Sequence, residues 1–350
     1  MPDPHASPLL AWPGAVGAGW PDEGVAAHYG DPLREQRATE ESAGVVDRSN
    51  RGVVRITGPD RLSWLHSLTT QALDGLAPGA SAQALVLSPN GHVEHHLTLT
   101  DDGTATWLHV EPGTAAALVE FLESMRFMLR VEVADVSGDH AVLTVLGPSA
   151  GDIAAGLDGV RASVNPGPFG TIDLIVARDR LADAAGELAG RGAAVAGMWA
   201  FEALRIAAHV PRLGLDTDHR TIPHEVGWID AAVRLDKGCY RGQETVARVH
   251  NLGHPPRRLV FLSLDGSEDR LPGHGDPVEL AGDDQGATIG FTGSAARHYE
   301  LGPIALALVK RTVPVEATLL AGGVPAAQEV IVPPDAGANV KVTLRRRQLM

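Results

Sequence analysis

The pattern of apolar residues changes at His254-Pro255-Pro256, and this change constrains the fold more than any other feature of the chain. From residue 45 to this point, strand-like and helix-like patterns alternate, and some of the strands are joined by hairpin turns. Beyond it, short apolar runs are separated by Gly, Pro and Asp, with no helical period. The sequence therefore predicts an α+β part, followed after residue 255 by a small β-barrel or sandwich.

Individual elements can be placed before and after this boundary. Residues 1–44 show little periodicity and predict an extended lead segment. A Pro-Asn-Gly turn at 89–91, between apolar runs at 84–87 and 92–100, predicts a hairpin. Apolar residues three and four apart predict one helix from Leu62 to Leu76 and a second from Thr114 to Leu129. Strands of the β part are expected at 259–262, 277–280, 287–292, 304–309 and 340–344.

Charge and cysteine content narrow the classes of function. The chain has 29 Lys and Arg against 43 Asp and Glu, a net charge of −14, which disfavours direct nucleic-acid binding. The single cysteine, Cys239, excludes an internal disulfide framework and a self-contained thiolate-ligated cluster. No apolar run approaches the roughly 18 residues of a membrane span, so we expect a cytoplasmic protein with no membrane partner.

The segment from Lys237 to Arg248 concentrates unusual chemistry around that cysteine. Gly238 and Gly242 permit a tight backbone on both sides of Cys239, and a helix can begin at Gln243. Lys237, Arg241 and a helix start all favour a thiolate over a thiol. Two interpretations stay open: Cys239 is a reactive thiol or metal ligand, or it is a small buried apolar residue.

A histidine cluster follows the hairpin turn. On a strand, residues two apart share a face, so His92, Glu94 and His96 are expected to lie together. Two imidazoles and a carboxylate could ligate Zn²⁺ or Fe²⁺. The alternative is a polar strand face beside a cavity, with no metal.

The Lys237-Gly238-Cys239-Tyr240-x-Gly242-Gln243-Glu244 motif resembles the signature of the YgfZ family of folate-binding proteins, which is related to the aminomethyltransferases of the glycine cleavage system. Further similarity lies in the four segments Asp47-Arg48-Ser49, Gly58-Pro59-Asp60-Arg61, Ile222-Pro223-His224-Glu225 and Gly302-Pro303-Ile304-Ala305. The resemblance implies three domains in a ring around a folate cavity. These would be a discontinuous α/β domain (45–137 and 195–254), a small inserted α/β domain (138–194) and a C-terminal β-barrel (255–350).

The resemblance also implies a function. Tetrahydrofolate or a derivative would be the cofactor, and the protein would assist iron–sulfur cluster assembly or repair, with assembly or client proteins as partners and with only an indirect effect on tRNA modification. Cys239 would be the reactive thiol or transient ligand, kept anionic by Lys237 and Arg241. The residues implied in cofactor binding are His96, Arg205, Glu225, Gly238, Tyr240, Gly242, Gln243, Glu244 and Arg248.

Two departures from the transferase relatives argue against aminomethyl transfer. Where those enzymes carry an Asp pair after the hairpin turn, this chain has histidines, in the segment 91–96. Where they carry a pterin-binding glutamate, two residues after the arginine that aligns with Arg205, this chain has Ala207. A one-carbon transferase with an altered amine substrate and a folate-binding module without chemistry remain as alternatives.

Overall fold

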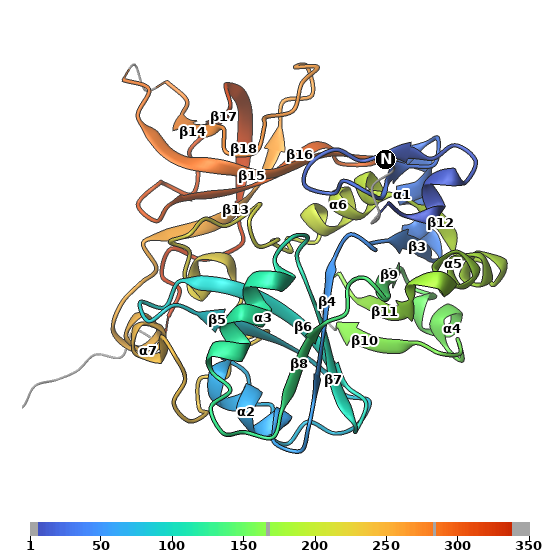
Figure 1. Cartoon of the computed structure of the whole chain (residues 1–350). Coiled ribbons are helices and arrows are strands. Elements are labelled where there is room, and N and C mark those ends of the chain that lie inside the picture. Colours follow the sequence, from blue (N-terminus) through green and yellow to red (C-terminus); the bar gives the residue numbers. More distant parts are fainter. Residues whose placement is uncertain (1–5, 166–168, 283–284, 338–350) are drawn as a thin grey trace, which may run out of the picture.

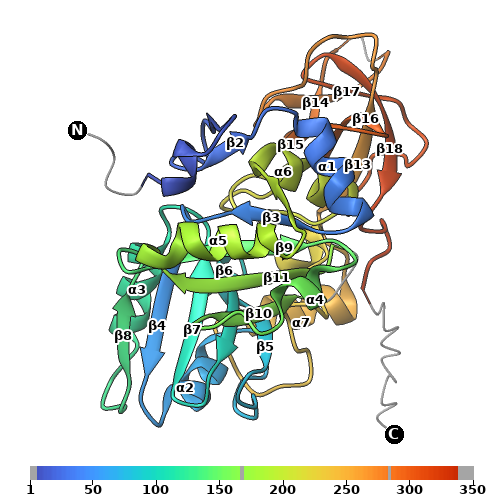
Figure 2. The ribbon, with the colours of Figure 1, turned by 90° about the vertical axis from the view of Figure 1, so that its right-hand side faces the viewer.

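The computed structural model describes residues 6–165, 169–282 and 285–337 as two five-stranded sheets, a closed barrel and a small N-terminal sheet (Figure 1). Figure 2 shows the two five-stranded sheets on one side of the molecule and the barrel above them. None of the helices in these residues is long and apolar enough to cross a bilayer.

The N-terminal segment is folded, and the expectation of an extended lead is wrong for it. It contains η1 (Pro8–Ala11), β1 (Val16–Gly17), β2 (Ala26–His28) and α1 (Pro32–Glu41). The Asp31 side chain caps α1 by accepting a hydrogen bond from the Arg34 N–H, and Pro32 occupies the first turn. The residues that α1 buries are polar: Glu35, Gln36 and Thr39. A helix with a polar buried face shows no apolar period, so sequence periodicity could not find it.

The first large sheet is antiparallel and has the strand order β5-β6-β7-β4-β8. Its strands are β4 (Gly52–Thr57), β5 (Ser81–Leu87), β6 (Val93–Asp101), β7 (Ala105–Val110) and β8 (Glu132–Asp135). The predicted hairpin is confirmed as β5 and β6. Both predicted helices are shorter than expected: α2 (Arg61–Leu68) and α3 (Ala115–Ser124). Helix α3 stops because residues 125–129 turn, with Met128 in the left-handed region at φ 55°.

The second sheet has the order β10-β11-β9-β3-β12. Its strands are β3 (Gly44–Asp47), β9 (His140–Leu146), β10 (Arg161–Asn165), β11 (Thr171–Ala177) and β12 (Ala194–Ala196). Helices α4 (Ala150–Ala154), η2 (Arg178–Arg180) and α5 (Leu181–Gly190) belong to the same part of the chain. The sheet thus includes β3, which lies outside the expected insertion at 138–194. The division into domains therefore stays a prediction.

The last part of the chain closes the barrel. Helices α6 (Met198–Ala207), η3 (Pro223–Val226) and α7 (Gln243–Leu252) lead to strands in the order β13-β16-β15-β14-β17-β18. The strands are β13 (Arg257–Leu264), β14 (Pro277–Leu280), β15 (Thr288–His298), β16 (Gly302–Lys310), β17 (Leu319–Ala321) and β18 (Val324–Val330). The predicted barrel is confirmed, although β17 and β18 were not foreseen. The strand expected at 340–344 lies outside the described residues.

Candidate functional site

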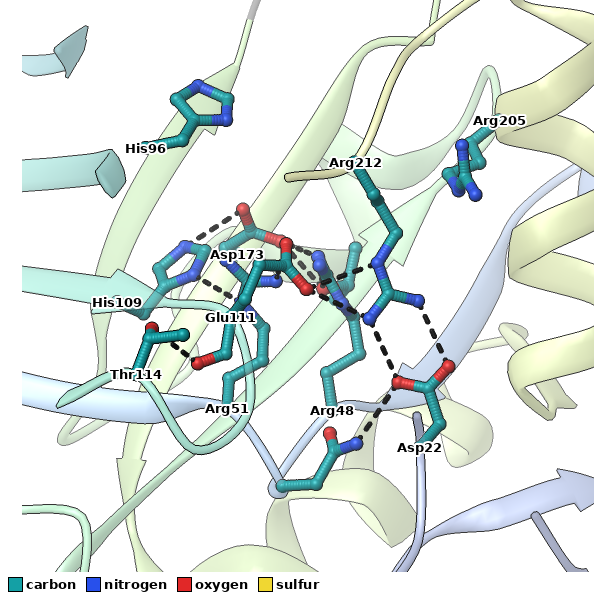
Figure 3. A network of polar contacts seen from close by, with 12 residues as sticks. Asp22, Arg48, Arg51, His96, His109, Glu111, Thr114, Asp173, Arg205 and Arg212 are labelled. Carbon is teal, nitrogen blue, oxygen red and sulfur yellow. Dashed lines mark hydrogen bonds and ion pairs between the residues drawn. The ribbon is translucent and has the colours of Figure 1, made fainter. Parts of the chain in front are cut away.

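A cavity of about 520 Å³ lies where the two large sheets meet the segments that follow α6. Its lining includes more cations than carboxylates, together with aromatic rings. The arginines are Arg48, Arg51, Arg205 and Arg212, the carboxylates Glu111 and Asp173, and the aromatic side chains Phe169, Phe201 and Trp228. Figure 3 shows most of these charged groups converging from separate strands and loops. We call this space the central cavity.

Arg212 joins several acidic groups at one wall of the central cavity (Figure 3). Its guanidinium lies 2.9 Å from a carboxylate oxygen of Asp22, 2.9 Å from Glu111 and 2.8 Å from Glu202. Burial alone would raise the pKa of Glu111, but Arg212 and Arg51 hold it well below its ordinary value. Arg205 and Arg212 likewise lower the pKa of Glu202, so both glutamates are ionised and paired in the interior, which fixes the shape of the wall.

A second chain of contacts runs through His109, which lies on β7. Arg51 Nε donates to His109 Nδ1 at 2.8 Å, and the other ring nitrogen lies 3.1 Å from Asp173 Oδ2. Because a guanidinium can only donate, Nδ1 is unprotonated, and Nε2–H donates to Asp173. Burial, followed by the charge of Arg51, lowers the pKa of His109 to about 4. The histidine is therefore neutral, with its tautomer set by its neighbours.

Arg48 is the cavity arginine with the most free hydrogen-bonding capacity. Its Nη1 donates to Thr144 Oγ1 at 3.2 Å and lies 3.5 Å from Asp173 Oδ1, while its guanidinium stacks over the Phe201 ring at 4.3 Å. Within the described residues, its Nε and Nη2 have no hydrogen-bond acceptor. A bound carboxylate could therefore accept from this guanidinium.

His96 and Trp228 form another wall of the central cavity. Their ring centroids are 4.7 Å apart, and His96 Nε2–H donates to Gln83 Oε1 at 3.0 Å. Burial lowers the pKa of His96 to about 4, so this ring is neutral near pH 7. Ala207, which stands where the transferases have a pterin-binding glutamate, also lines the central cavity. This part of the cavity offers flat aromatic surface and no carboxylate.

The expected cluster of His92, Glu94 and His96 does not form. The register of β6 against β5 shifts, so that Val86 pairs with His95 and Leu87 with Val93. The irregularity leaves Glu94 outside the regular pairing and breaks the alternation on which the expectation depended. His96 lines the central cavity, whereas His92 and Glu94 line a separate surface groove. Among the described residues, no three His, Cys, Asp or Glu side chains are arranged to hold a metal.

Arg205 and Glu225 have partners of their own. Arg205 lines the central cavity, but its guanidinium binds Asp216 at 2.9 Å and also pairs with Glu202. Glu225 is fully buried and lies 2.8 Å from Arg257 of the barrel strand β13. Glu225 is absent from the lining of the central cavity. Both residues therefore join parts of the fold rather than offering free polar groups.

Lys237 anchors the loop that carries the cysteine motif. The Lys237 ammonium group donates to the carbonyl oxygens of His66, Thr69 and Gln71, at the end of α2, with the Thr69 contact at 2.6 Å. It also lies 5.1 Å from the centre of the Tyr240 ring. Lys237 therefore binds α2, and its charge is engaged away from the thiol that it was expected to serve.

Three further motif residues hold the same loop. Tyr240 is buried, and Gln243 Nε2 donates to the Lys237 carbonyl at 3.2 Å. Gly242 has φ 82° and precedes α7, and a Cβ there would lie 2.6 Å from the Ser88 carbonyl oxygen. Only glycine fits this position, because the backbones of two loops touch.

The remaining motif residues face solvent. Gly238, Cys239, Glu244 and Arg248 are exposed, and the Cys239 thiol is free. Arg241 forms an ion pair of 2.9 Å with Glu94 and is likewise engaged away from the thiol. No residue from 237 to 248 lines the central cavity. The exposed thiol excludes the interpretation of Cys239 as a buried apolar residue, and it places the thiol where another protein can reach it.

Apart from Arg205, the charged groups of the central cavity were not predicted as site residues. In the sequence, Arg48 belongs to the Asp47-Arg48-Ser49 segment of similarity, and His109 stands outside any motif. Asp173 and His109 are charged or polar residues inside apolar strand runs, β11 and β7. Buried strands seldom carry such residues without partners, so this pattern was an available signal.

Comparisons with known proteins agree with this fold. Residues 26–180 match the model of the GCVT N-terminal domain. An aminomethyltransferase of Synechococcus sp. (strain WH7803) is 27% identical, with the match covering 85% of this chain and 89% of the relative. One of Moorella thermoacetica is 28% identical, covering 88% and 90%. The crystal structure of the glycine cleavage system aminomethyltransferase T from Bartonella henselae matches with a TM-score of 0.78 at 20% identity, covering 93% of this chain and 96% of that one. The expected fold, α+β with an aminomethyltransferase-like architecture and a C-terminal β-barrel, is thereby confirmed.

Proposed function

We propose that this chain, which has the aminomethyltransferase fold and carries a GCVT N-terminal domain, binds a reduced folate in its central cavity. We propose further that it acts as YgfZ-like proteins do, assisting iron–sulfur cluster assembly or repair in other proteins through Cys239. Aminomethyl transfer is not part of the proposed function.

The central cavity supports the first half of the proposal, and it is the observation on which the proposal depends most. Its volume of about 520 Å³ falls within the range of about 300–1,000 Å³ for small-molecule sites. A folate combines a flat heteroaromatic ring with a glutamate tail. Aromatic surface at Trp228 and His96 suits the ring, and the free donors of Arg48 suit a tail carboxylate. The residues present therefore fit the cofactor.

Tetrahydrofolate carries one-carbon units on its nitrogens N5 and N10, and this is the chemistry it would supply when bound. The protein would hold it with Trp228, His96 and Arg48. The paired charges around Arg212 and His109 would keep the wall rigid and exclude water.

The groups missing from the central cavity argue against aminomethyl transfer. Ala207 brings no carboxylate, and His96 is neutral with its Nε2–H committed to Gln83. An acid whose charge orients a folate amine is not replaced by a neutral imidazole. Purified protein should form no methylenetetrahydrofolate from an aminomethylated carrier protein. Formation of that product would favour the alternative, a transferase.

The cysteine loop supports the second half of the proposal, the role in iron–sulfur cluster assembly or repair. Lys237, Tyr240, Gly242 and Gln243 hold the loop, and Cys239 is its free, exposed thiol. One thiol cannot hold a stable four-thiolate cluster, so a cluster would be shared with a partner and treated as cargo. A rigid loop that presents a single thiol to solvent suits transient ligation or exchange.

The direct test is titration of the purified protein with tetrahydrofolate. We expect saturable binding that weakens about tenfold in His96→Ala, because an aromatic wall is lost. Glu244→Gln is the matched control, since Glu244 is exposed and outside the central cavity, and it should bind as the wild type does. Absence of binding, or equal loss in the two variants, would contradict the proposal.

A further inference from the structure

A second groove, separate from the central cavity, lies between α7, the hairpin turn after β5 and the barrel strands β15 and β16. Its volume is about 730 Å³. Figure 1 shows α7 beneath the barrel and next to β5. A Cβ on Gly91 of the hairpin turn would lie 2.8 Å from the Thr245 side chain, so turn and helix are in close contact. We call this space the α7 groove.

The rim of the α7 groove is strongly basic on an otherwise acidic chain. It includes Arg220, Arg248, Arg257 and Lys310. The single carboxylate among its lining residues is Glu225, which Arg257 neutralises at 2.8 Å. A concentration of positive charge is unexpected in a chain with a net charge of −14.

Two of these cations are unpaired. Within the described residues, the side chains of Arg220 and Arg248 have neither an ion pair nor a hydrogen bond, and both are exposed. Lys310 donates only to the Thr288 carbonyl, at 3.0 Å, and keeps further donors. Arg257, by contrast, is held by Asp218 and Glu225. The groove thus brings together three cationic side chains that keep free hydrogen-bond donors.

The floor of the α7 groove is apolar. It is formed by Ile222, Val249, Ile289, Phe291 and Leu308. Cations around an apolar floor suit a ligand with both kinds of surface. A simple inorganic anion would leave the floor unused, and a purely apolar ligand would leave the arginines unused.

We propose that the α7 groove binds a small multivalent anion that carries an aromatic or apolar ring, as a nucleoside diphosphate does. Arg220 and Arg248 would bind the phosphates, Lys310 would add charge, and Phe291 with its apolar neighbours would contact the ring. The groove shares no lining residue with the central cavity, so this binding is separate from that of folate.

Isothermal titration of the full chain with ADP at low salt tests the proposal. We expect saturable binding that weakens as salt is raised, because exposed charges are screened. Adenosine, which lacks phosphate, should bind at least about tenfold more weakly, and so should pyrophosphate, which lacks the ring. Equal binding of adenosine and ADP would contradict the role of the arginines, and equal binding of pyrophosphate and ADP would contradict that of the floor.

Variants locate the site. Arg220→Gln and Arg248→Gln should each weaken ADP binding about tenfold, since each removes a charged donor from the phosphates. Arg180→Gln is the control, because Arg180 is also an exposed arginine but lies outside the groove. Arg220→Gln should leave tetrahydrofolate affinity unchanged, which separates this proposal from that of the central cavity. No ADP binding by the wild type, or equal binding by the Arg220→Gln and Arg180→Gln proteins, would overturn it.

Discussion

The central cavity and the cysteine loop use charged side chains in opposite ways. In the central cavity, Arg212 and Glu111 are buried, and their partners come from distant parts of the sequence. In the loop, the ammonium group of Lys237 donates to backbone carbonyl oxygens, and the neighbouring Cys239 thiol is exposed. A cavity built from paired charges is shaped in advance for a small ligand, whereas an exposed thiol on an anchored loop can meet a macromolecule.

The largest difference between the regions should appear in stability. Arg212→Met would leave Asp22, Glu111 and Glu202 without their shared cation, and we expect a loss of about 3–5 kcal/mol in the free energy of unfolding. In Arg241→Met, which removes a half-buried pair with Glu94, the loss should stay within about 1 kcal/mol. Urea unfolding measures both. Equal losses would mean that the buried network does not hold the central cavity together.

Acid should destabilise the protein through the central cavity. The pKa of His109 is about 4 in the folded protein, below its ordinary value of 6.5. As pH falls through this window, the unfolded chain binds the proton first, so stability should decrease by up to roughly 3 kcal/mol. In His109→Gln, unfolding measured from pH 7 to pH 4 should show a shallower decrease. If the free energy of unfolding of His109→Gln fell as steeply with pH as that of the wild type, His109 would not contribute to the acid sensitivity.

The anchoring of the loop should have a smaller effect. Lys237→Met leaves three carbonyl oxygens without their donor, and we expect a loss of about 1–3 kcal/mol. Because the loop would loosen, the alkylation rate of Cys239 should also change. The comparable variant Arg234→Met removes only an exposed pair with Asp236 and should alter neither quantity. If the Lys237→Met and Arg234→Met proteins had the same free energy of unfolding and the same alkylation rate of Cys239, the loop would be held by other contacts.

The smallest effect on the folded protein is expected at the thiol itself. Cys239→Ser should keep the melting temperature, because an exposed hydroxyl is hydrated. Cluster-dependent enzymes in cells that carry only this variant should lose activity. Full enzyme activity with a stable variant protein would leave the folate-binding module as the better interpretation.

The sequence predicted the parts of the fold that follow local patterns. The hairpin of β5 and β6, the start of α7 at Gln243 and the barrel all have short-range signals. Helix α1 did not, because Glu35 and Gln36 occupy its buried face. The register shift in β6 also had no local signal, and it was enough to separate Glu94 from His96.

The site was harder to predict than the fold. The cysteine motif is recognisable because its residues are adjacent in sequence. The resemblance predicts that Lys237 serves the thiol and that Tyr240 binds the cofactor, whereas in the structure both hold the loop. The resemblance predicted a folate cavity with His96 and Arg205 among its residues, and both line the central cavity. The network of Asp22, Glu111 and Arg212 was not predicted, since its members meet only in three dimensions. Residues that are close together in the sequence therefore identified the cysteine loop. The walls of the ligand-sized cavity depend on contacts between residues far apart in the sequence.

The most direct test of the account is whether the central cavity and the thiol are separate. The alkylation rate of Cys239 would be measured with and without tetrahydrofolate at a concentration that saturates the protein. No residue of the loop lines the central cavity, so the account predicts the same rate in both conditions. Strong protection of Cys239 by bound tetrahydrofolate would contradict the account, because it would place the thiol at the folate site.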